Sequence, residues 1–228
     1  MKNMEQGIGR IDRVLLERII HKIDLSADIP KTSQAEMAIP SYLNWNPLVR
    51  SIFWRRYDKV YGLAEFSPEM VVCELGCGIG VFLPMLMQET AKVYAVDLFP
   101  QYAQELAGEF DLDVIFSTDL DDVPDNSLDI LFAVEVLEHF DDLEAGIQLI
   151  TQKLKPGGQL IISGPTENLL YKTGRFVVGY NKYHEYHRNN IYGIRQAILD
   201  AGYTIEKTIK FPSGIILLNL ICSFRVNK

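Results

Sequence analysis

The strongest chemical signal in the sequence is an acid followed by three glycines at alternate positions. Glu74 comes first, and Gly76, Gly78 and Gly80 follow it in the stretch ELGCGIG. Glycine lets the chain turn tightly and lets a ligand contact the backbone, because no Cβ stands in the way. The apolar run before Glu74 predicts a buried parallel strand, and the periodic apolar residues after Gly80 predict a helix. This order predicts a nucleotide-binding cradle at the carboxyl end of a sheet.

The spacing of the glycines bears on which nucleotide is bound. A dinucleotide fingerprint reads G-x-G-x-x-G/A, with the third small residue on the helix, whereas Val81 follows Gly80 here. An NAD(P)-dependent oxidoreductase is therefore the less favoured interpretation. Cys77, inside the turn, is interpreted as a small residue that fits the turn, since no base that would make it a nucleophile is near it in the sequence.

A second acid follows at the spacing that ribose recognition requires. The run KVYAV predicts the second strand, and Asp97 ends it, about 20 residues after the glycines, where a β-α-β unit returns an acid to the ribose hydroxyls. A carboxylate accepts both vicinal hydroxyls in charge-assisted hydrogen bonds. Leu98 and Phe99, just beyond, are expected to pack against the base.

The ordered set E-x-G-x-G-x-G, Asp97, Asp119, PDNSLDILFAVEVLEH and LKPGGQLIIS resembles the core of the class I S-adenosylmethionine-dependent methyltransferases, in particular the type 11, ubiquinone-biosynthesis-like ones. The resemblance covers roughly residues 71–164 and extends more weakly over 189–222. It implies a Rossmann-like α/β fold, in which a seven-stranded, mostly parallel sheet has helices on both faces and an antiparallel last strand. It also implies a methyltransferase whose cofactor is S-adenosyl-L-methionine.

The resemblance implies roles for particular residues. Glu74 is expected to meet the methionine end of the cofactor, and Asp97 the ribose. Asp119 is expected to accept from the adenine amino group, although an Asp that merely caps the next turn is the alternative. The residues expected to contact the cofactor are Glu74, Gly76, Cys77, Gly78, Gly80, Asp97, Leu98, Thr118, Asp119, Leu120 and Glu135.

Two regions are additions to this core. Residues 1–66 predict an N-terminal helical extension, with amphipathic helices over about 8–24 and 46–63. These helices either cap the substrate side or merely cover the sheet, and both interpretations stay open. Residues 67–228 form the predicted methyltransferase domain, in which the long connection over residues 165–189 is expected to form the acceptor pocket or a lid.

Candidate catalytic groups follow from the chemistry of the acceptor. A hydroxyl or carbon acceptor must lose a proton, and histidine is the usual base because its pKa is near neutrality. His139, His184 and His187 are the candidates, whereas His21 lies on a predicted surface helix. Glu135, Glu138 and His139 are similar to the divalent-metal site of some O-methyltransferases, so a Mg²⁺ site is an alternative. The interpretation without a metal is favoured, because the same letters occur in relatives with no known metal.

The composition of the chain limits which binding partners and which cellular setting are expected. The net charge of −8 disfavours nucleic acid, and an odd count of three cysteines with no secretory signal pattern predicts a reducing, cytoplasmic setting. No apolar run is long enough for a transmembrane helix, although the basic, aromatic insertion leaves a peripheral membrane contact open.

The expected acceptor is a small or lipid-like molecule methylated at O, C or N. A non-catalytic methyltransferase-like subunit is the other alternative, against which the intact motif acids argue; no oligomeric state is indicated.

Overall fold

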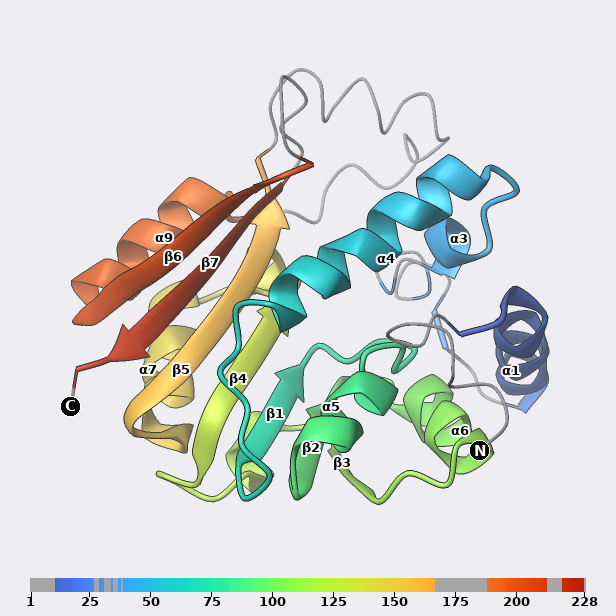
Figure 1. Cartoon of the computed structure of the whole chain (residues 1–228), viewed down its shortest axis with the longest axis horizontal. Coiled ribbons are helices and arrows are strands. Elements are labelled where there is room, and N and C mark those ends of the chain that lie inside the picture. Colours follow the sequence, from blue (N-terminus) through green and yellow to red (C-terminus); the bar gives the residue numbers. More distant parts are fainter. Residues whose placement is uncertain are drawn as a thin grey trace. The chain divides into compact units, whose positions relative to one another are not determined.

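A computed structural model describes residues 11–26, 29–30, 34, 37, 39–166, 188–212 and 219–227. Seven strands form one sheet in the order β3-β2-β1-β4-β5-β7-β6 (Figure 1). Strand β7 runs antiparallel to both β5 and β6, while β1–β2, β2–β3 and β4–β5 are parallel pairs. The predicted fold class, a mostly parallel sheet with an antiparallel last strand, is therefore confirmed.

The chain divides into two compact units, and each is described by itself. The first unit comprises Met1–Asp58 and Phe66–Asp119, and the second comprises Lys59–Glu65 and Leu120–Lys228. The predicted separation of a helical extension from a methyltransferase domain near residue 66 stays a prediction.

The first unit carries three parallel strands and the helices between them. The strands are β1 (Val71–Leu75), β2 (Lys92–Val96) and β3 (Val114–Ser117); the helices α5 (Leu83–Glu89) and α6 (Gln101–Glu109) connect them. The β-branched and apolar residues of β1 and β2 are almost wholly buried, as expected of strands covered on both faces. The strands therefore stand where the sequence pattern predicts them.

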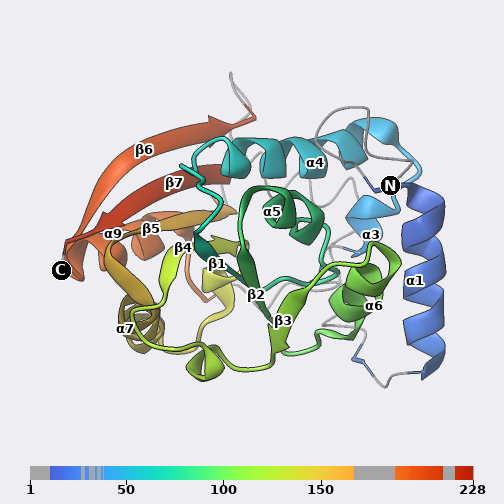
Figure 2. The ribbon, with the colours of Figure 1, turned by 60° about the horizontal axis from the view of Figure 1, so that its bottom comes forward.

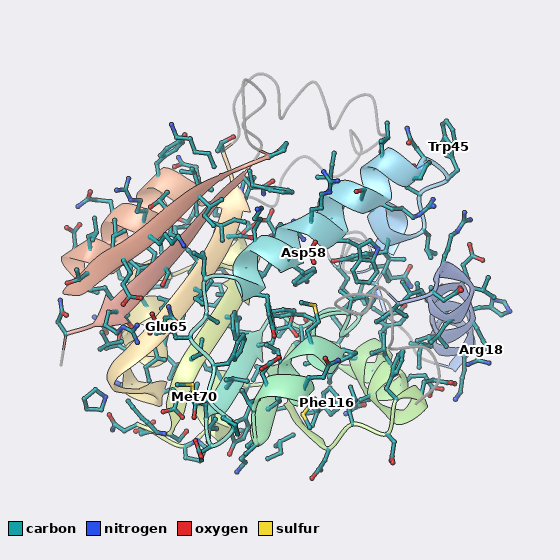
Figure 3. All side chains as sticks on the ribbon, viewed as in Figure 1. Arg18, Trp45, Asp58, Glu65, Met70 and Phe116 are labelled. Carbon is teal, nitrogen blue, oxygen red and sulfur yellow. The ribbon has the colours of Figure 1, made fainter. Side chains whose placement is uncertain are left out.

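Helix α1 (Arg13–Ser26) packs against α6 in the first unit (Figure 2). Its apolar face, including Leu16 and Ile19, is buried. Arg18, labelled in Figure 3, pairs with Glu109 at 2.7 Å, and Lys22 pairs with Glu105. Exposed ion pairs of this kind contribute little free energy, so burial of the apolar face accounts for most of this packing. Two further helices precede β1: α3 (Ile39–Tyr42) and α4 (Pro47–Tyr61).

In the longer segment of the second unit, two short 3₁₀ turns flank strand β4 (Leu128–Val134). They are η1 (Leu120–Asp122) before the strand and η2 (Leu137–His139) after it. Helix α7 (Leu143–Lys153) starts at Asp142, whose side chain accepts from Ala145 N at 3.0 Å. The remaining elements are β5 (Leu154–Pro165), α9 (Ile191–Asp200), β6 (Tyr203–Phe211) and β7 (Asn219–Val226).

The segment KPGG follows α7 within the part of the sequence that resembles the family core. Strand β5 starts directly at Leu154, and the segment KPGG lies inside the strand as an irregularity: Leu128 faces Leu154, but Ile130 faces Gln159. Gly157 takes a φ of +74° there, which glycine adopts without strain. Most of the predicted insertion, residues 167–187, lies outside the described residues. Among the residues that are described, no helix has the length and apolar character needed to cross a membrane.

Candidate functional site

The glycine turn after β1 is built as the sequence predicts. Gly76, Gly78 and Gly80 have φ values of +73°, +53° and +76°, which L-residues with side chains rarely adopt. Gly76 N donates to Val96 O at 2.8 Å, and Gly80 N donates to Cys77 O at 2.8 Å. These bonds tie the turn to the end of β2 and close it on itself.

Gly80 is required by packing as well as by its backbone conformation. A Cβ at this position would lie 2.9 Å from both Cα and Cβ of Ala103 on α6. Real Cβ atoms do not approach backbone atoms this closely, so a larger residue would push α6 away from the turn. A Cβ on Gly78 would make only ordinary contacts of 3.6 Å with Met37, and the φ of Gly78 is therefore the reason for glycine there.

Gly80→Ala is expected to lower the free energy of unfolding by about 2 kcal/mol or more, since it combines a left-handed φ with overpacking. Chemical denaturation measures this difference. Gly108→Ala is the matched control: Gly108 lies in α6, and a Cβ there would meet nothing within 4 Å. The control should leave stability unchanged or raise it by up to about 1 kcal/mol. Equal effects of the two substitutions would contradict the packing argument.

Asp97 is fastened to the glycine turn through its carboxylate. Oδ2 accepts from Gly78 N at 2.8 Å, and Oδ1 accepts from Phe99 N at 2.9 Å. Asp97 is half-buried, and Leu98 beside it is 77% exposed. The predicted ribose-binding acid therefore has a fixed orientation, and an apolar side chain lies open next to it.

Glu74 on β1 is only 1% exposed, and neither of its carboxylate oxygens has a hydrogen-bond partner among the described residues. Burial, and then the negative charge of Asp97, raise the pKa of Glu74 well above its ordinary value. A buried carboxylate without a partner is costly to ionise, and a cation bound beside it would remove that cost. The α-ammonium group of S-adenosylmethionine is such a cation, so the residues present fit this cofactor.

Two buried tyrosines from the N-terminal helices, Tyr42 and Tyr57, lie near this acid, and the buried Arg56 lies beside both of them. Sequence reasoning did not place them here. The two phenols are hydrogen-bonded to each other; burial first, and the charge of Glu74 to a smaller extent, raises the pKa of both. The Tyr57 ring packs on Phe82 with centroids 4.9 Å apart. Arg56 and Tyr57 lie on the helix predicted over about 46–63, whereas Tyr42 lies outside both predicted helices.

Burial also changes the acidity of the Cys77 side chain. It raises the pKa of the Cys77 thiol well above its ordinary value, and the charges of Glu74 and Asp97 act in the same direction. Since the thiolate is the nucleophilic form, this environment favours the interpretation of Cys77 as a residue that fits the turn.

Thr118 and Asp119 follow the carboxyl end of β3, next to β2. Asp97 N donates to Ser117 O at 3.2 Å, and Asp119 N donates to the Ser117 hydroxyl at 3.0 Å. Both Thr118 and Asp119 are exposed. The structure thus brings the first-unit acids Glu74, Asp97 and Asp119 to the carboxyl ends of three adjacent strands.

The second unit contains Leu120 and Glu135. Leu120 is buried at the start of η1. Glu135 directly follows β4 with a φ of +56°, and its carboxylate accepts hydrogen bonds from the Ser163 hydroxyl and the Asn219 amide. Sequence reasoning missed Ser163 and Asn219, which lie 28 and 84 positions away from Glu135 along the chain.

The proposed metal ligands Glu138 and His139 lie on η2. The Glu138 side chain is buried, and its carbonyl oxygen accepts from Arg188 N at 2.9 Å. Within the described part of the chain, no group of three His, Cys, Asp or Glu side chains is arranged to hold a metal ion. His184 and His187 lie outside the described residues.

The chain is similar in sequence to known methyltransferases. A family model described as a methyltransferase domain matches residues 53–207. An ubiquinone biosynthesis O-methyltransferase from Idiomarina loihiensis is 30% identical over 105 residues, which cover 43% of this chain and 43% of that protein. A human tRNA N(3)-cytidine methyltransferase is 29% identical over 122 residues, covering 47% and 43%. The chain thus spans less than half the length of these curated relatives.

A solved structure shares the fold over most of the chain. Magnesium protoporphyrin IX methyltransferase from Synechocystis PCC 6803, crystallised with bound SAH, superposes with a TM-score of 0.65 at 20% identity, covering 92% of this chain and 99% of that one. The protein therefore has the fold of the class I S-adenosylmethionine-dependent methyltransferases. Because the family model matches more than half of its length, the chain belongs to the methyltransferase domain family.

Proposed function

We propose that this chain transfers the methyl group of S-adenosylmethionine to a small-molecule or lipid-like acceptor at oxygen, carbon or nitrogen. The observation that carries the proposal is the buried carboxylate of Glu74, which no described residue hydrogen-bonds, next to a glycine turn that is hydrogen-bonded to a second acid, Asp97. This pair of acids suits a ligand with a cationic amino-acid end and a ribose.

Each first-unit residue has a distinct proposed role. Glu74 would hold the α-ammonium group. Asp97 would accept hydrogen bonds from the ribose hydroxyls through the carboxylate lone pairs that Gly78 N and Phe99 N do not use. Gly76, Cys77, Gly78 and Gly80 would face the ligand with their backbone, while Leu98, Thr118 and Asp119 would contact the adenine. Leu120 and Glu135 of the second unit complete the set predicted from the sequence.

The bound cofactor supplies an electrophilic methyl group on a sulfonium. The protein's contribution to such a displacement is to hold the acceptor atom in line with and close to that methyl, which can supply about 7–11 kcal/mol. Exclusion of water and removal of the acceptor's proton add to this.

The test of the proposal is a titration followed by a transfer assay. Calorimetry with S-adenosylhomocysteine and with NADH should give binding of the first alone. Labelled S-adenosylmethionine is then offered with a panel of phenols, alcohols, amines, 1,3-diketones and carboxylic acids, in water-soluble and lipid-like forms. Preferential binding of NADH would point to an oxidoreductase, and binding of S-adenosylhomocysteine without transfer would point to a non-catalytic subunit.

One of the histidines His139, His184 and His187 is expected to act as the base that takes the acceptor's proton. Substituting that histidine with alanine should lower turnover about 100-fold or more, with the affinity for S-adenosylhomocysteine unchanged. His21→Ala, on the exposed side of α1, is the control. Unchanged turnover in all three variants would assign proton removal to another group.

Transfer is expected to proceed without a bound metal ion. We propose this because the Glu135 carboxylate is already engaged by Ser163 and Asn219. Turnover should therefore survive exhaustive treatment with a chelator followed by dialysis. Loss of turnover that Mg²⁺ restores would instead support a site made of Glu135, Glu138 and His139.

A further inference from the structure

Two large apolar side chains stand in solvent at the start of α4. Trp45, just before the helix, is 83% exposed, the highest fraction of any large apolar side chain among the described residues, and Leu48 in the first turn is 74% exposed. Figure 3 shows the Trp45 ring projecting outward from the ribbon. We call residues 45–48 the α4 tip. Exposed apolar side chains that lie together mark a surface for interaction.

The backbone of the α4 tip is held by hydrogen bonds. Asn46 N donates to Asn44 Oδ1 at 2.9 Å, and Leu48 N donates to Asn46 Oδ1 at 2.9 Å. The Asn46 side chain thereby caps the helix. Arg50, one turn into the helix, donates from Nη1 to the carbonyl oxygens of Asn44 and Trp45. The chain therefore holds Trp45 in its exposed position through a well-bonded turn.

Local packing gives no reason for a tryptophan at position 45. An apolar residue just before a helix cap often packs against an apolar residue at the fourth helical position, as a hydrophobic staple. That position is held by Arg50, and the Trp45 ring stays in water. Tryptophan gains a large free energy when its ring leaves water, and the chain itself does not use this free energy at Trp45.

The segment around the α4 tip is basic, although the whole chain is acidic. Residues 39–57 contain the three arginines Arg50, Arg55 and Arg56 and no aspartate or glutamate, whereas the net charge of the chain is −8. Arg55 is exposed and follows Leu48 by seven positions, which is two helical turns. Residues seven positions apart lie on the same face of a helix. An exposed apolar side chain and an exposed cation therefore share one face of α4.

A lipid bilayer fits this surface better than a folded protein does. A stable protein interface takes about 800 Å² from each partner, whereas the α4 tip offers two fully exposed apolar side chains. A bilayer surface requires no matching shape. It accepts tryptophan rings at the level of the headgroups, apolar side chains just beneath them, and cationic side chains beside anionic headgroups. The basic segment also lets an acidic chain approach an anionic surface, which would otherwise repel it.

We propose that the α4 tip binds the surface of an anionic lipid bilayer, with Trp45 and Leu48 inserted at the headgroup level and Arg55 beside lipid phosphates. The inference does not depend on methyl transfer, because none of these residues is proposed to hold the cofactor. Tyr57, further along α4, lies near Glu74. It is separated from the tip by on the order of 15 Å of helix, so docking would hold the Glu74 site close to the bilayer.

The experiment measures cosedimentation of the full chain with vesicles of an equimolar mixture of phosphatidylcholine and phosphatidylglycerol, and with vesicles of phosphatidylcholine alone. Wild type should bind the anionic vesicles about 10-fold more tightly, and added salt should weaken that binding. Trp45→Ala and Leu48→Ala should each weaken it about 10-fold or more, because each removes a side chain that leaves water on insertion. Arg55→Ala should weaken binding to the anionic vesicles about 5-fold.

A matched control and a second measurement make the result specific to the α4 tip. Val14→Ala removes an apolar side chain that is 71% exposed on α1 and should bind both kinds of vesicle like wild type. The chain has two tryptophans, and Trp54 is buried, so the emission of Trp54→Phe comes from Trp45 alone. This emission should shift to shorter wavelength when anionic vesicles are added. If Trp54→Phe does not fold, the difference between wild type and Trp45→Phe gives the same information.

The inference is overturned if wild type does not bind the anionic vesicles, if Trp45→Ala and Leu48→Ala bind them like Val14→Ala, or if the Trp45 emission does not shift. A wild-type dimer that Trp45→Ala converts to a monomer, as measured by light scattering, would overturn it in favour of a contact between copies of this chain. A chain that does not bind S-adenosylhomocysteine removes the proposed function and leaves this inference standing, because the vesicle assay contains no cofactor.

Discussion

Glu74→Gln is expected to weaken binding of S-adenosylhomocysteine by at least about 30-fold, because it removes one member of a desolvated charge pair, a loss of roughly 2–5 kcal/mol. The same substitution should raise the melting temperature of the ligand-free chain at neutral pH. Glu74 is buried without a hydrogen-bond partner among the described residues, and its ionised form is therefore the costly one. A gain in stability together with a loss of binding is characteristic of a residue kept for function.

The pH dependence follows from the direction of the pKa shift. Burial, and then Asp97, raise the Glu74 pKa above its ordinary value of 4.5, so above that pH the folded chain binds more protons than the unfolded chain. The stability that Glu74 contributes to the ligand-free protein is then fully present below about pH 4.5, and it is lost as pH rises through the folded-state pKa of Glu74. Glu74→Gln should remove this decline, and thermal melts at a series of pH values measure it.

Two comparisons make the result specific to the amino-acid end of the ligand. 5′-Methylthioadenosine has the ribose and adenine but no α-ammonium group, so its affinity should not change in Glu74→Gln. Glu69→Gln removes an exposed carboxylate just before the same strand, one that accepts a hydrogen bond from Ser67, and it should leave the binding of both ligands unchanged. Equal weakening of both ligands by Glu74→Gln would place Glu74 elsewhere in the site.

Asp97→Ala is expected to weaken both S-adenosylhomocysteine and 5′-methylthioadenosine about 100-fold or more. The substitution removes the proposed contacts to two ribose hydroxyls, and each hydrogen bond to a charged acceptor is worth about 1.5–3 kcal/mol. It also deprives Gly78 N and Phe99 N of their acceptor, so the free energy of unfolding should fall by about 1–2 kcal/mol. Calorimetry and chemical denaturation measure the two effects.

Asp97→Asn refines this prediction. Asparagine keeps one carbonyl oxygen, but its N–H₂ would face the N–H of either Gly78 or Phe99. It should therefore lose nearly as much affinity as alanine. Asp113→Ala, an exposed acid before β3, is the control and should bind both ligands like wild type. If the Asp97→Ala variant kept its affinity for 5′-methylthioadenosine, Asp97 would not be the residue that binds the ribose hydroxyls.

Much of the fold was predictable because its signals are local. The strands β1, β2 and β4 are mostly apolar, with one charged residue in each, and the topology brings the residues at their carboxyl ends to one edge of the sheet. The glycine turn was predictable for a similar reason, since its three positive φ values exclude most other residues. Helix boundaries were less accurate: the helix predicted over 8–24 is observed at Arg13–Ser26, with residues 1–10 outside the described part.

The rest of the candidate site depends on pairing between distant segments. Asn219 reaches Glu135 only because β7 folds back antiparallel beside β5, and a single sequence carries no sign of that register. Tyr42 and Tyr57 come near Glu74 only through the way their helices pack, which the sequence does not show locally. The left-handed conformation of Glu135 has no local signature, because glutamate is not a residue that usually adopts it.

The double attachment of the Asp97 carboxylate has a thermodynamic consequence. One side chain fixes both the loop after β1 and the loop after β2. The conformational entropy of these loops is therefore lost during folding, and association with a nucleoside proceeds without a disorder-to-order step at this point.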